Sequence, residues 1–554
     1  MALFLSLALN ALLALESSAS LTDYAPSFTT CPDTSLVRTF SAGQQALNPS
    51  ESHFVSQREK QVISQNWRAW LGDGSAIGYD TYEFTDFARV GLAFSGGGYR
   101  ASNFGAGVIS AIDARNATSV SAGTGGLLQV ASYLSGLSGG AWLTGSLYMN
   151  EFPTTQEMVL GTQPGWTADK DLLLPGSATN LTSAENLAYF ENIDISIDSK
   201  AAAGFNITIG DGWARMLSYH FLNGTNDVSF FDTSSHGAGQ SWSGIQTATF
   251  FKELQAPFPL VTIDTNGTFN TTTGTTVLDL NVWEVSPFEF ASFDPDVSAG
   301  ADLTYIGTSL FKGVPLNASS CVVGFDEAGF VIGTSSNIYW GVLASGDVQE
   351  VELLASIFGA PVNEETPAVA AVSKWPNPFQ GIAPSTFVDS SSSELNLIDG
   401  GTNGENVPFN PLLVKAREID VIVAVDASDD TNNSWPSGAA LLLTAERGAA
   451  FLQETHQQLP EMPASVDDFA AQGLNLRPTF FGCDSTDAPL VIWLPNAPPL
   501  NGDAPFPTLQ QNKSSSNETK RKSSSTKRTK IPSGVSFQTP TLLIQTGADA
   551  CSAP

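Results

Sequence analysis

The sequence predicts an α/β fold with parallel strands in its sheet. Residues Val90–Gly140 alternate short apolar runs with glycine turns and helix-like stretches, which is the strand-turn-helix order of such folds. Two later apolar runs, Leu395–Ile398 and Ile419–Val425, are typical of strands covered on both faces. With 554 residues, of which 42% are hydrophobic, the chain is long enough to enclose a large core.

The sequence around the two glycine turns, Ser95–Gly98 and the turn at Ser138, predicts an ordered series of strands and helices. We expect a buried strand, a glycine turn, a helix, a second strand and, after a turn at Ser138, a helix through Met149. Both turns therefore follow a strand and precede a helix. The first four elements are Arg89–Phe94, Ser95–Gly98, Tyr99–Ala114 and Leu127–Leu134.

Other segments differ in composition. Residues 151 to about 300 are rich in Thr, Gly, Asn and aromatic residues, and we interpret them as an insertion or cap with irregular structure. Residues 513–530 are rich in Ser and basic residues, so they cannot bury enough surface to order themselves. We interpret that stretch as a solvated loop, with a protease-sensitive site or a contact to an anionic surface as the alternative. We expect a signal peptide over residues 1–19 and one folded domain over 20–505. A disordered basic segment over 510–534 and a tail over 535–554 would follow.

The charge of the chain limits its classes of partner. Acidic residues outnumber basic ones, 55 against 24, and the formal net charge is −31. Such a surplus repels phosphate backbones, so we expect no nucleic-acid partner bound by bulk electrostatics. An extracellular, acid-tolerant protein fits this charge.

The N-terminus predicts secretion. The run Ala2–Leu15 is apolar and the small residues Ser17–Ser20 follow it, so the stretch resembles a signal peptide cleaved near Ala19. A buried helix is the alternative. No later stretch is apolar for long enough to span a bilayer, and Ala548–Pro554 carry no hydrophobic tail. We therefore expect neither a transmembrane segment nor a C-terminal lipid anchor.

Cysteines and glycosylation motifs agree with secretion. The four cysteines, Cys31, Cys321, Cys483 and Cys551, permit two disulfides in three possible pairings, and free buried thiols are the alternative. Their spacing does not resemble a metal site. The motif Asn-x-Ser/Thr begins at Asn116, Asn180, Asn206, Asn223, Asn266, Asn270, Asn317, Asn432, Asn512 and Asn517.

Ser138, within Gly136-Leu137-Ser138-Gly139-Gly140, is the first candidate for chemistry. Gly-x-Ser-x-Gly fits the nucleophile elbow, in which a serine lies in a sharp turn between strand and helix and glycines avoid clashes. The helix that follows would direct its N–H groups and its positive dipole end toward developing negative charge. A serine in an ordinary glycine-rich turn is the alternative, but the strand-turn-helix context favours a nucleophile.

The glycine run before Arg100 is the second candidate. Consecutive glycines at 96–98 expose backbone N–H groups at a helix start, which suits an anion or an oxyanion, and a tight turn before a packed helix is the alternative. Gly96-x-Gly98-x-x-Ala101 nominally fits a dinucleotide fingerprint, but no convincing acidic residue closes a βαβ unit. The Arg100 guanidinium would either pair with a phosphate or form a structural ion pair.

A carboxylate at a strand end is the third candidate. Asp399 follows the strand Leu395–Ile398 and precedes two glycines, so it can reach a site at the carboxyl edge of the sheet, although Asp-Gly is also a common turn dipeptide. Asp426 after Ile419–Val425 is a rival on the same reasoning. No histidine lies in a convincing motif, which favours a dyad in which a desolvated carboxylate with a raised pKa removes the serine proton. The four histidines are His53, His220, His236 and His456.

Three motifs together resemble the signature blocks of fungal phospholipase B, also called lysophospholipase, a family related to the catalytic domain of cytosolic phospholipase A2. They are SGGGYRA at 95–101, GLSGGAW at 136–142 and LIDGGTNGENVPFNPL at 397–412. Further matching stretches are WEVSPFEF at 283–290, CVVGFDEAGF at 321–330, and DVIVAVD at 420–426 followed by WPSG at 435–438. After about Pro498 the resemblance fades, and a basic Ser/Lys stretch replaces the expected aromatic- and cysteine-rich tail.

The resemblance implies both a fold and a set of roles. The fold would be a patatin-like, three-layer arrangement with a central mixed sheet flanked by helices and a cap over the site, which makes the domain over 20–505 catalytic. Ser138 would be the nucleophile and Asp399 its partner. The amides of Gly97 and Gly98 would form the oxyanion hole, and Arg100 would contact the substrate phosphate or support the site.

The implied activity is hydrolysis of fatty acyl esters of lysophospholipids, and of diacyl phospholipids as a further substrate class, at a membrane or micelle interface. The resemblance implies an acyl-enzyme intermediate and requires no metal or cofactor. A broader acyl hydrolase or lipase is one alternative. A catalytically silent secreted glycoprotein on the same fold is the other.

Overall fold

A mixed β-sheet forms the centre of the computed structural model. The structure describes residues 19–496, apart from 76–77, 79, 162–164, 268, 271–274, 340–370 and 432–433. Strands β14 (Ser373–Pro376) and β15 (Glu394–Asp399) branch from β5 of this sheet. The main path of the sheet is, in order, β17 (Thr479–Phe481), β18 (Leu490–Pro495), β16 (Val421–Asp426), β3 (Val90–Phe94), β4 (Ala131–Gly136), β5 (Phe258–Thr265), β8 (Val282–Val285), β9 (Glu289–Ser292), β10 (Ala299–Asp302) and β2 (Val37–Thr39).

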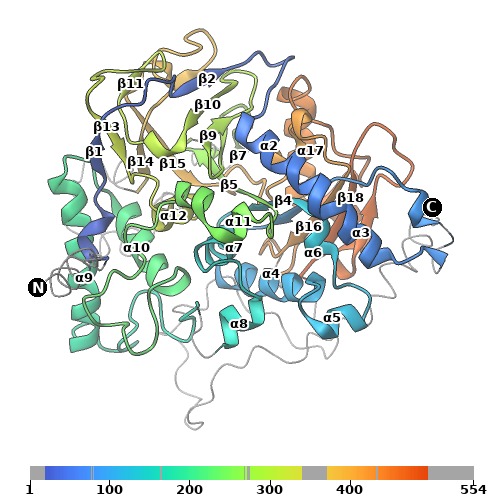
Figure 1. Ribbon diagram of the computed structural model, residues 1–554, viewed down its shortest axis with the longest axis horizontal. Coiled ribbons are helices and arrows are strands. Elements are labelled where there is room, and N and C mark those ends of the chain that lie inside the picture. The colour runs from blue at the N-terminus through green and yellow to red at the C-terminus, as the bar shows by residue number, and fades with distance from the viewer. Residues whose placement is uncertain are drawn as a thin grey trace, which may run out of the picture.

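The sheet has a parallel half and an antiparallel half. Strands β18, β16, β3, β4 and β5 run parallel, whereas β5, β8, β9, β10 and β2 alternate in direction. In Figure 1 the orange strands β16 and β18, from late in the chain, lie near β4 in the middle of the molecule. Because parallel strands end at one edge, the turns after β3 and β4 emerge side by side.

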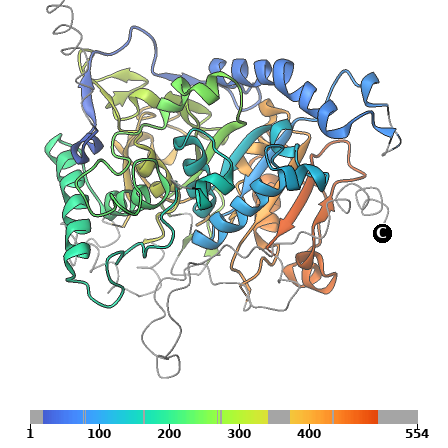
Figure 2. The same cartoon turned by 60° about the horizontal axis from the view of Figure 1, so that its bottom comes forward.

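Helices flank the sheet. Figure 2 shows α2 and α3 along one side of the strands and α4 along the other. In the part of the chain that the structure describes, no helix is both long and apolar enough to cross a membrane. The longer helices are α2 (Pro49–Arg58), α3 (Ser64–Leu71), α4 (Gly98–Ile112), α7 (Gly139–Met149), α9 (Ala184–Ala202), α10 (Ile209–Phe221), α12 (Ala328–Ser335) and α17 (Ala439–Phe451).

Strand β15 meets β4 end to end along one edge of β5. The register pairs Gly136 of β4 with Val261, and Asp399 of β15 with Ile263. Since β8 occupies the opposite edge of β5 at these positions, β4 and β15 share one edge and run toward each other. The turn after β4 and the end of β15 are therefore brought together by a common neighbour.

The second expected strand begins later than the sequence predicts. Residues Leu127–Val130 form the short helix α6, and β4 starts at Ala131. The Gly126 carbonyl accepts hydrogen bonds from the amides of Gln129 and Val130, which closes one helical turn. A short apolar run does not by itself distinguish a buried strand from a buried helical turn. The other predicted strands and both helices are confirmed within a few residues.

Residues 151–300 are more regular than their composition predicts. The first part contains the helices α8 (Thr155–Leu160), α9 and α10, but the last part supplies β5, β8, β9 and β10 to the central sheet. The expectation of irregular structure is therefore wrong for 258–300. All eight residues of β5 are buried, including the polar residues Thr262 and Asp264, so both faces of this strand are covered. The expected signal peptide, basic segment and tail lie outside the described residues.

One disulfide and one buried ion cluster join distant parts of the chain. Cys31 is bonded to Cys321, which fixes the N-terminal segment to β13 (Cys321–Val323), and Cys483 is also disulfide-bonded. Buried Arg417 pairs with Glu51 of α2 at 2.8 Å and with Glu284 of β8 at 2.5 Å. Removing one partner of such a buried pair typically costs about 3–5 kcal/mol, so this cluster fixes α2 against the sheet.

Candidate active site

Ser138 lies in the sharp turn between β4 and α7. Its backbone has φ 50° and ψ −118°, a conformation that non-glycine residues rarely adopt. A Cβ atom at Gly136 would lie 2.5 Å from the Gly140 carbonyl oxygen, and one at Gly140 would lie 2.1 Å from the Phe94 carbonyl oxygen. Both glycines of Gly-x-Ser-x-Gly are thus required by the close packing of the turn.

The surroundings of Ser138 hold its backbone on both sides. Its N–H donates to the Ser335 hydroxyl oxygen at 3.1 Å, and its carbonyl accepts the Trp142 N–H at 3.1 Å. The residue is 7% exposed. Helix α7 begins at the next residue, so its positive end points to this turn.

Asp399 reaches the same place from the end of β15. Its Oδ1 accepts the Gly401 N–H at 2.8 Å, and its own N–H donates to the Asn337 carbonyl at 3.1 Å. Burial raises the pKa of Asp399 to about 6, against the opposing effect of the Gly401 amide and of a hydrogen bond with the Ser138 side chain. The carboxyl group is therefore ionised at neutral pH and is basic enough to accept a proton.

The rival carboxylate, Asp426, is occupied elsewhere. Its Oδ1 accepts the Ser428 N–H at 2.9 Å and the Ser428 hydroxyl at 2.6 Å, and its Oδ2 accepts the Trp493 indole N–H at 3.0 Å. Burial raises its pKa too. Because both oxygens serve the loop after β16 and the neighbouring β18, this side chain has a structural role.

The glycine run packs directly against the Ser138 turn. Gly97 has φ 127° and Gly98 has φ 57°, and α4 begins at Gly98. A Cβ atom at Gly139 would lie 2.3 Å from the Gly98 carbonyl oxygen and 2.7 Å from its amide nitrogen. Among the hydrogen bonds of the described residues, none uses the amides of Gly97 or Gly98. Two free amides at a helix start beside a serine can stabilise an oxyanion.

Arg100 is largely buried behind this glycine run. Its guanidinium donates to the carbonyls of Ala427 and Ser434, and its Nε is buried with no hydrogen-bond partner among the described residues. Burial lowers its pKa, opposed by Asp429, Asp426 and Asp430 in that order. The side chain therefore ties the loop after β16 to α4, and it retains donors that the two carbonyls do not use.

The histidines lie apart from this arrangement. His220 and His236 are in the region of α10, where burial lowers their pKa values to about 3 and about 4. Burial also lowers the pKa of His456, which lies beside Thr455. No hydrogen bond of the described residues joins a histidine to Ser138 or Asp399.

Two site residues were not expected from the sequence. The Ser335 hydroxyl contacts the Ser138 amide, and the Asn406 side chain donates to the Ser428 hydroxyl at 2.7 Å and to the Gly96 carbonyl at 3.3 Å. Asn406 lies within the third matching motif, which could have drawn attention to it. Ser335 lies at the end of the apolar helix α12 and carries no local signal.

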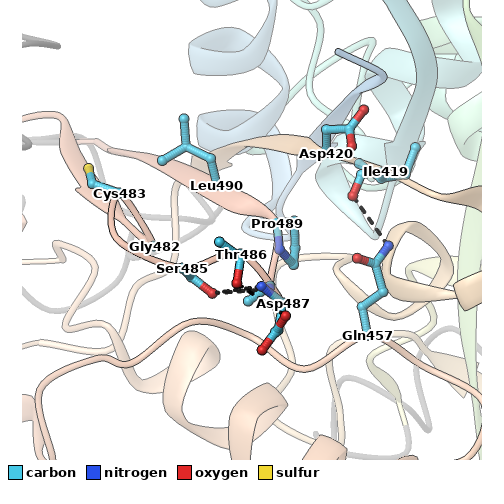
Figure 3. Close-up of a pocket in the computed structure, with 11 residues that line it drawn as sticks. Ile419, Asp420, Gln457, Gly482, Cys483, Ser485, Thr486, Asp487, Pro489 and Leu490 are labelled. Atoms are coloured by element: carbon cyan, nitrogen blue, oxygen red, sulfur yellow. Dashed lines mark hydrogen bonds between the residues drawn. The ribbon is translucent and has the colours of Figure 1, made fainter.

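The larger of two described cavities is remote from this site. It has a volume of about 430 Å³ and is lined by residues near Asp420 and 482–490. Figure 3 shows Gln457 at its border, where the side-chain amide donates to the Ile419 carbonyl at 3.2 Å. The second cavity lies near Arg38 and Glu289. Neither Ser138 nor Asp399 lines either cavity, so volume does not identify the site here.

Comparisons with known proteins agree on one family. The family model described as the lysophospholipase catalytic domain matches residues 90–532, beyond the point at which the motifs fade. Lysophospholipase 3 of Aspergillus fumigatus is 36% identical over 493 residues, covering 86% of this chain and 76% of that protein. Lysophospholipase 2 of Saccharomyces cerevisiae is 36% identical over 518 residues, covering 87% and 69%.

A solved structure supports the same fold. Human GIVD cytosolic phospholipase A2 superimposes with a TM-score of 0.58 at 20% identity, covering 84% of this chain. The matched part spans 57% of the human chain. The expected central mixed sheet flanked by helices is thereby confirmed.

Proposed function

This chain belongs to the lysophospholipase catalytic-domain family, and from that premise we propose that it hydrolyses fatty acyl esters of lysophospholipids through Ser138 and Asp399. Diacyl phospholipids are included as a further substrate class. One observation supports the proposal: β15 runs end to end toward the elbow of Ser138 and ends in Asp399, a buried carboxylate whose pKa burial raises to about 6 and the Ser138 side chain lowers.

The proposed reaction is a two-step acyl transfer. Asp399 accepts the hydroxyl proton as Ser138 attacks the ester carbonyl, and the proton then passes to the leaving glycerophospho-alcohol. The amides of Gly97 and Gly98 stabilise the tetrahedral oxyanion, an effect worth roughly 3 kcal/mol per donor. Water then attacks the acyl-enzyme, with Asp399 again accepting a proton, and releases the fatty acid.

Arg100 decides between two substrate ranges. As a phosphate ligand it would restrict the enzyme to phospholipids, because guanidinium groups bind phosphate in two-pronged fashion. Its two hydrogen bonds to backbone carbonyls instead favour a second candidate, a broader acyl hydrolase in which Arg100 only supports the site. We propose the phosphate role because the carbonyls of Ala427 and Ser434 leave some donors of the Arg100 guanidinium unused, Nε among them.

Product analysis tests the proposal. Purified protein should release fatty acid from a lysophospholipid, and Ser138→Ala should abolish this release. Arg100→Ala should lose most turnover of the lysophospholipid and of its diacyl parent but keep turnover of a simple ester. Full activity in Ser138→Ala would refute the nucleophile, and equal losses on all esters would favour the broader hydrolase. No turnover by the wild type would favour a silent protein.

We also propose that the protein is secreted and glycosylated and acts at a lipid interface. The Cys31–Cys321 disulfide supports an oxidising compartment. Candidate glycosylation sites at Asn180, Asn206, Asn223 and Asn317 are exposed. Mass spectrometry of protein from the culture medium, before and after enzymatic deglycosylation, tests both points. Protein that is retained in cells and carries no glycan would contradict them.

A further inference from the structure

The end of helix α12 contacts both halves of the proposed dyad. Ser335, the last residue of α12, is fully buried. Its hydroxyl oxygen accepts the Ser138 N–H at 3.1 Å and its hydroxyl group donates to the Thr262 carbonyl at 2.7 Å. Since the hydroxyl proton is directed to Thr262 on β5, a lone pair is directed to the Ser138 amide.

Backbone carbonyls at the end of α12 and just after it accept hydrogen bonds from Asp399, the other half of the proposed dyad, and from the residue that follows it. The Ser335 carbonyl accepts the Gly400 N–H at 3.1 Å, and the Asn337 carbonyl accepts the Asp399 N–H at 3.1 Å. Positions 335 and 337 therefore contact the turn after β4 and the end of β15. Through Thr262 the segment is also tied to β5, the strand along which β4 and β15 meet.

This contact matters because the Ser138 turn is strained. A non-glycine residue in such a conformation costs of order 1–3 kcal/mol and persists only when its surroundings over-determine it. The glycines around Ser138 supply no side chains that could hold the turn. The hydrogen bond from its N–H to Ser335 is thus one of the few directional restraints on the backbone that carries the proposed nucleophile.

We propose that Ser335 is a positioning residue of the reaction, which sets the placement of the Ser138 hydroxyl relative to Asp399. This inference rests on the proposed function. Ser335→Ala would leave the Ser138 N–H without its acceptor and loosen the turn, while the backbone bonds to Gly400 and Asp399 remain. The loss should therefore fall on turnover rather than on substrate binding, because the substrate is held elsewhere.

Ser336 is a matched control. It is 1% exposed, against 0% for Ser335, and its hydroxyl accepts the indole N–H groups of Trp142 at 2.9 Å and Trp213 at 3.0 Å. It also donates to the Ile332 carbonyl at 2.8 Å. Ser336 therefore makes at least as many hydrogen bonds as Ser335 at the same helix end, but none of them goes to Ser138 or Asp399.

The experiment compares Ser335→Ala, Ser335→Cys and Ser336→Ala with the full-length wild type. The readouts are kcat and KM on a lysophospholipid, the rate of covalent labelling by an alkyl fluorophosphonate, and the melting temperature. We expect kcat and the labelling rate of Ser335→Ala to fall about 10- to 100-fold with KM within about twofold. Ser336→Ala should lose as much thermal stability but keep both rates.

Three outcomes would overturn the inference. Unchanged rates in Ser335→Ala would remove the positioning role, and so would equal rate losses in Ser335→Ala and Ser336→Ala. Failure of both Ser335 variants to fold, with Ser336→Ala folded, would make Ser335 a structural residue. A wild type that is labelled at Ser138 but does not hydrolyse lysophospholipids would refute the proposed function instead, and the labelling rates would still test Ser335.

Discussion

The ends of β15 and β16 resemble each other in sequence and differ in what they offer to chemistry. Each strand carries buried apolar residues and ends in a buried aspartate, Asp399 or Asp426. Burial raises both pKa values. Yet the Ser138 side chain is one of the groups that lower the pKa of Asp399, whereas both oxygens of Asp426 are occupied by Ser428 and Trp493.

The difference comes from the direction of the strands. Strand β16 runs parallel to β3, so Asp426 leaves the sheet beside the turn after β3 and faces its own loop. Strand β15 runs antiparallel to β5 and points at the end of β4. A carboxylate at a strand end thus becomes a candidate base when the strand runs toward a nucleophile and a lone pair of the carboxylate has no other hydrogen-bond donor.

Replacing each aspartate by asparagine gives the largest expected contrast. Asp399→Asn removes the proposed base at constant shape, so kcat on a lysophospholipid should fall about 10³- to 10⁴-fold with the fold intact. Asp426→Asn places an NH₂ group against donors from Ser428 or Trp493, which should cost about 1–3 kcal/mol of stability. Its kcat, corrected for the folded fraction, should stay within about tenfold. Equal kcat losses in the two variants would remove the distinction between the strand ends.

The pH dependence of kcat/KM should follow the ionisation of the Asp399 carboxylate. Asp399 accepts a proton only when ionised, so kcat/KM should rise with pH through about 6 and level off above it.

The pKa of Asp399 in the folded state lies above the ordinary value of 3.8, so its contribution to the free energy of unfolding is complete below about pH 4 and is lost as pH rises through about 6. Asp399→Asn should thus be at least as stable as the wild type at pH 8. An acid limb that stays near pH 6 in Asp399→Asn would contradict the assignment.

The smallest expected effect concerns the support of Asp426. Ser428→Ala removes the hydroxyl that donates to Asp426 at 2.6 Å and accepts from Asn406 at 2.7 Å. Chemical denaturation should show a loss of about 1–2 kcal/mol, because a buried donor loses its partner. Turnover should fall less than about tenfold, since neither Asp399 nor Ser138 is changed. A loss as large as that of Asp399→Asn would place Asp426 in the reaction itself.

The sequence predicted the local parts of the site and not their mutual placement. The elbow around Ser138, the glycine run and the apolar strands have local signatures, because turn sterics and burial act within a few residues. Asp399 and Asp426 could not be ranked from composition, since the order of strands in the sheet decides between them. Ser335 is separated by 197 positions from the Ser138 amide that it contacts, and only the fold brings the two together. β5 was missed because it lies within a stretch rich in Thr, Gly, Asn and aromatic residues, a composition that indicates an irregular insertion.

The central claim is that Asp399, and not Asp426, activates Ser138. The most direct measurement is the rate at which an alkyl fluorophosphonate labels Ser138, followed by peptide mass spectrometry at pH 7.5 in the wild type, Asp399→Asn and Asp426→Asn. The account predicts one label on Ser138, a rate reduced at least about 10³-fold in Asp399→Asn, and a rate within about tenfold of the wild type in Asp426→Asn. Unimpaired labelling of Ser138 in Asp399→Asn would contradict it.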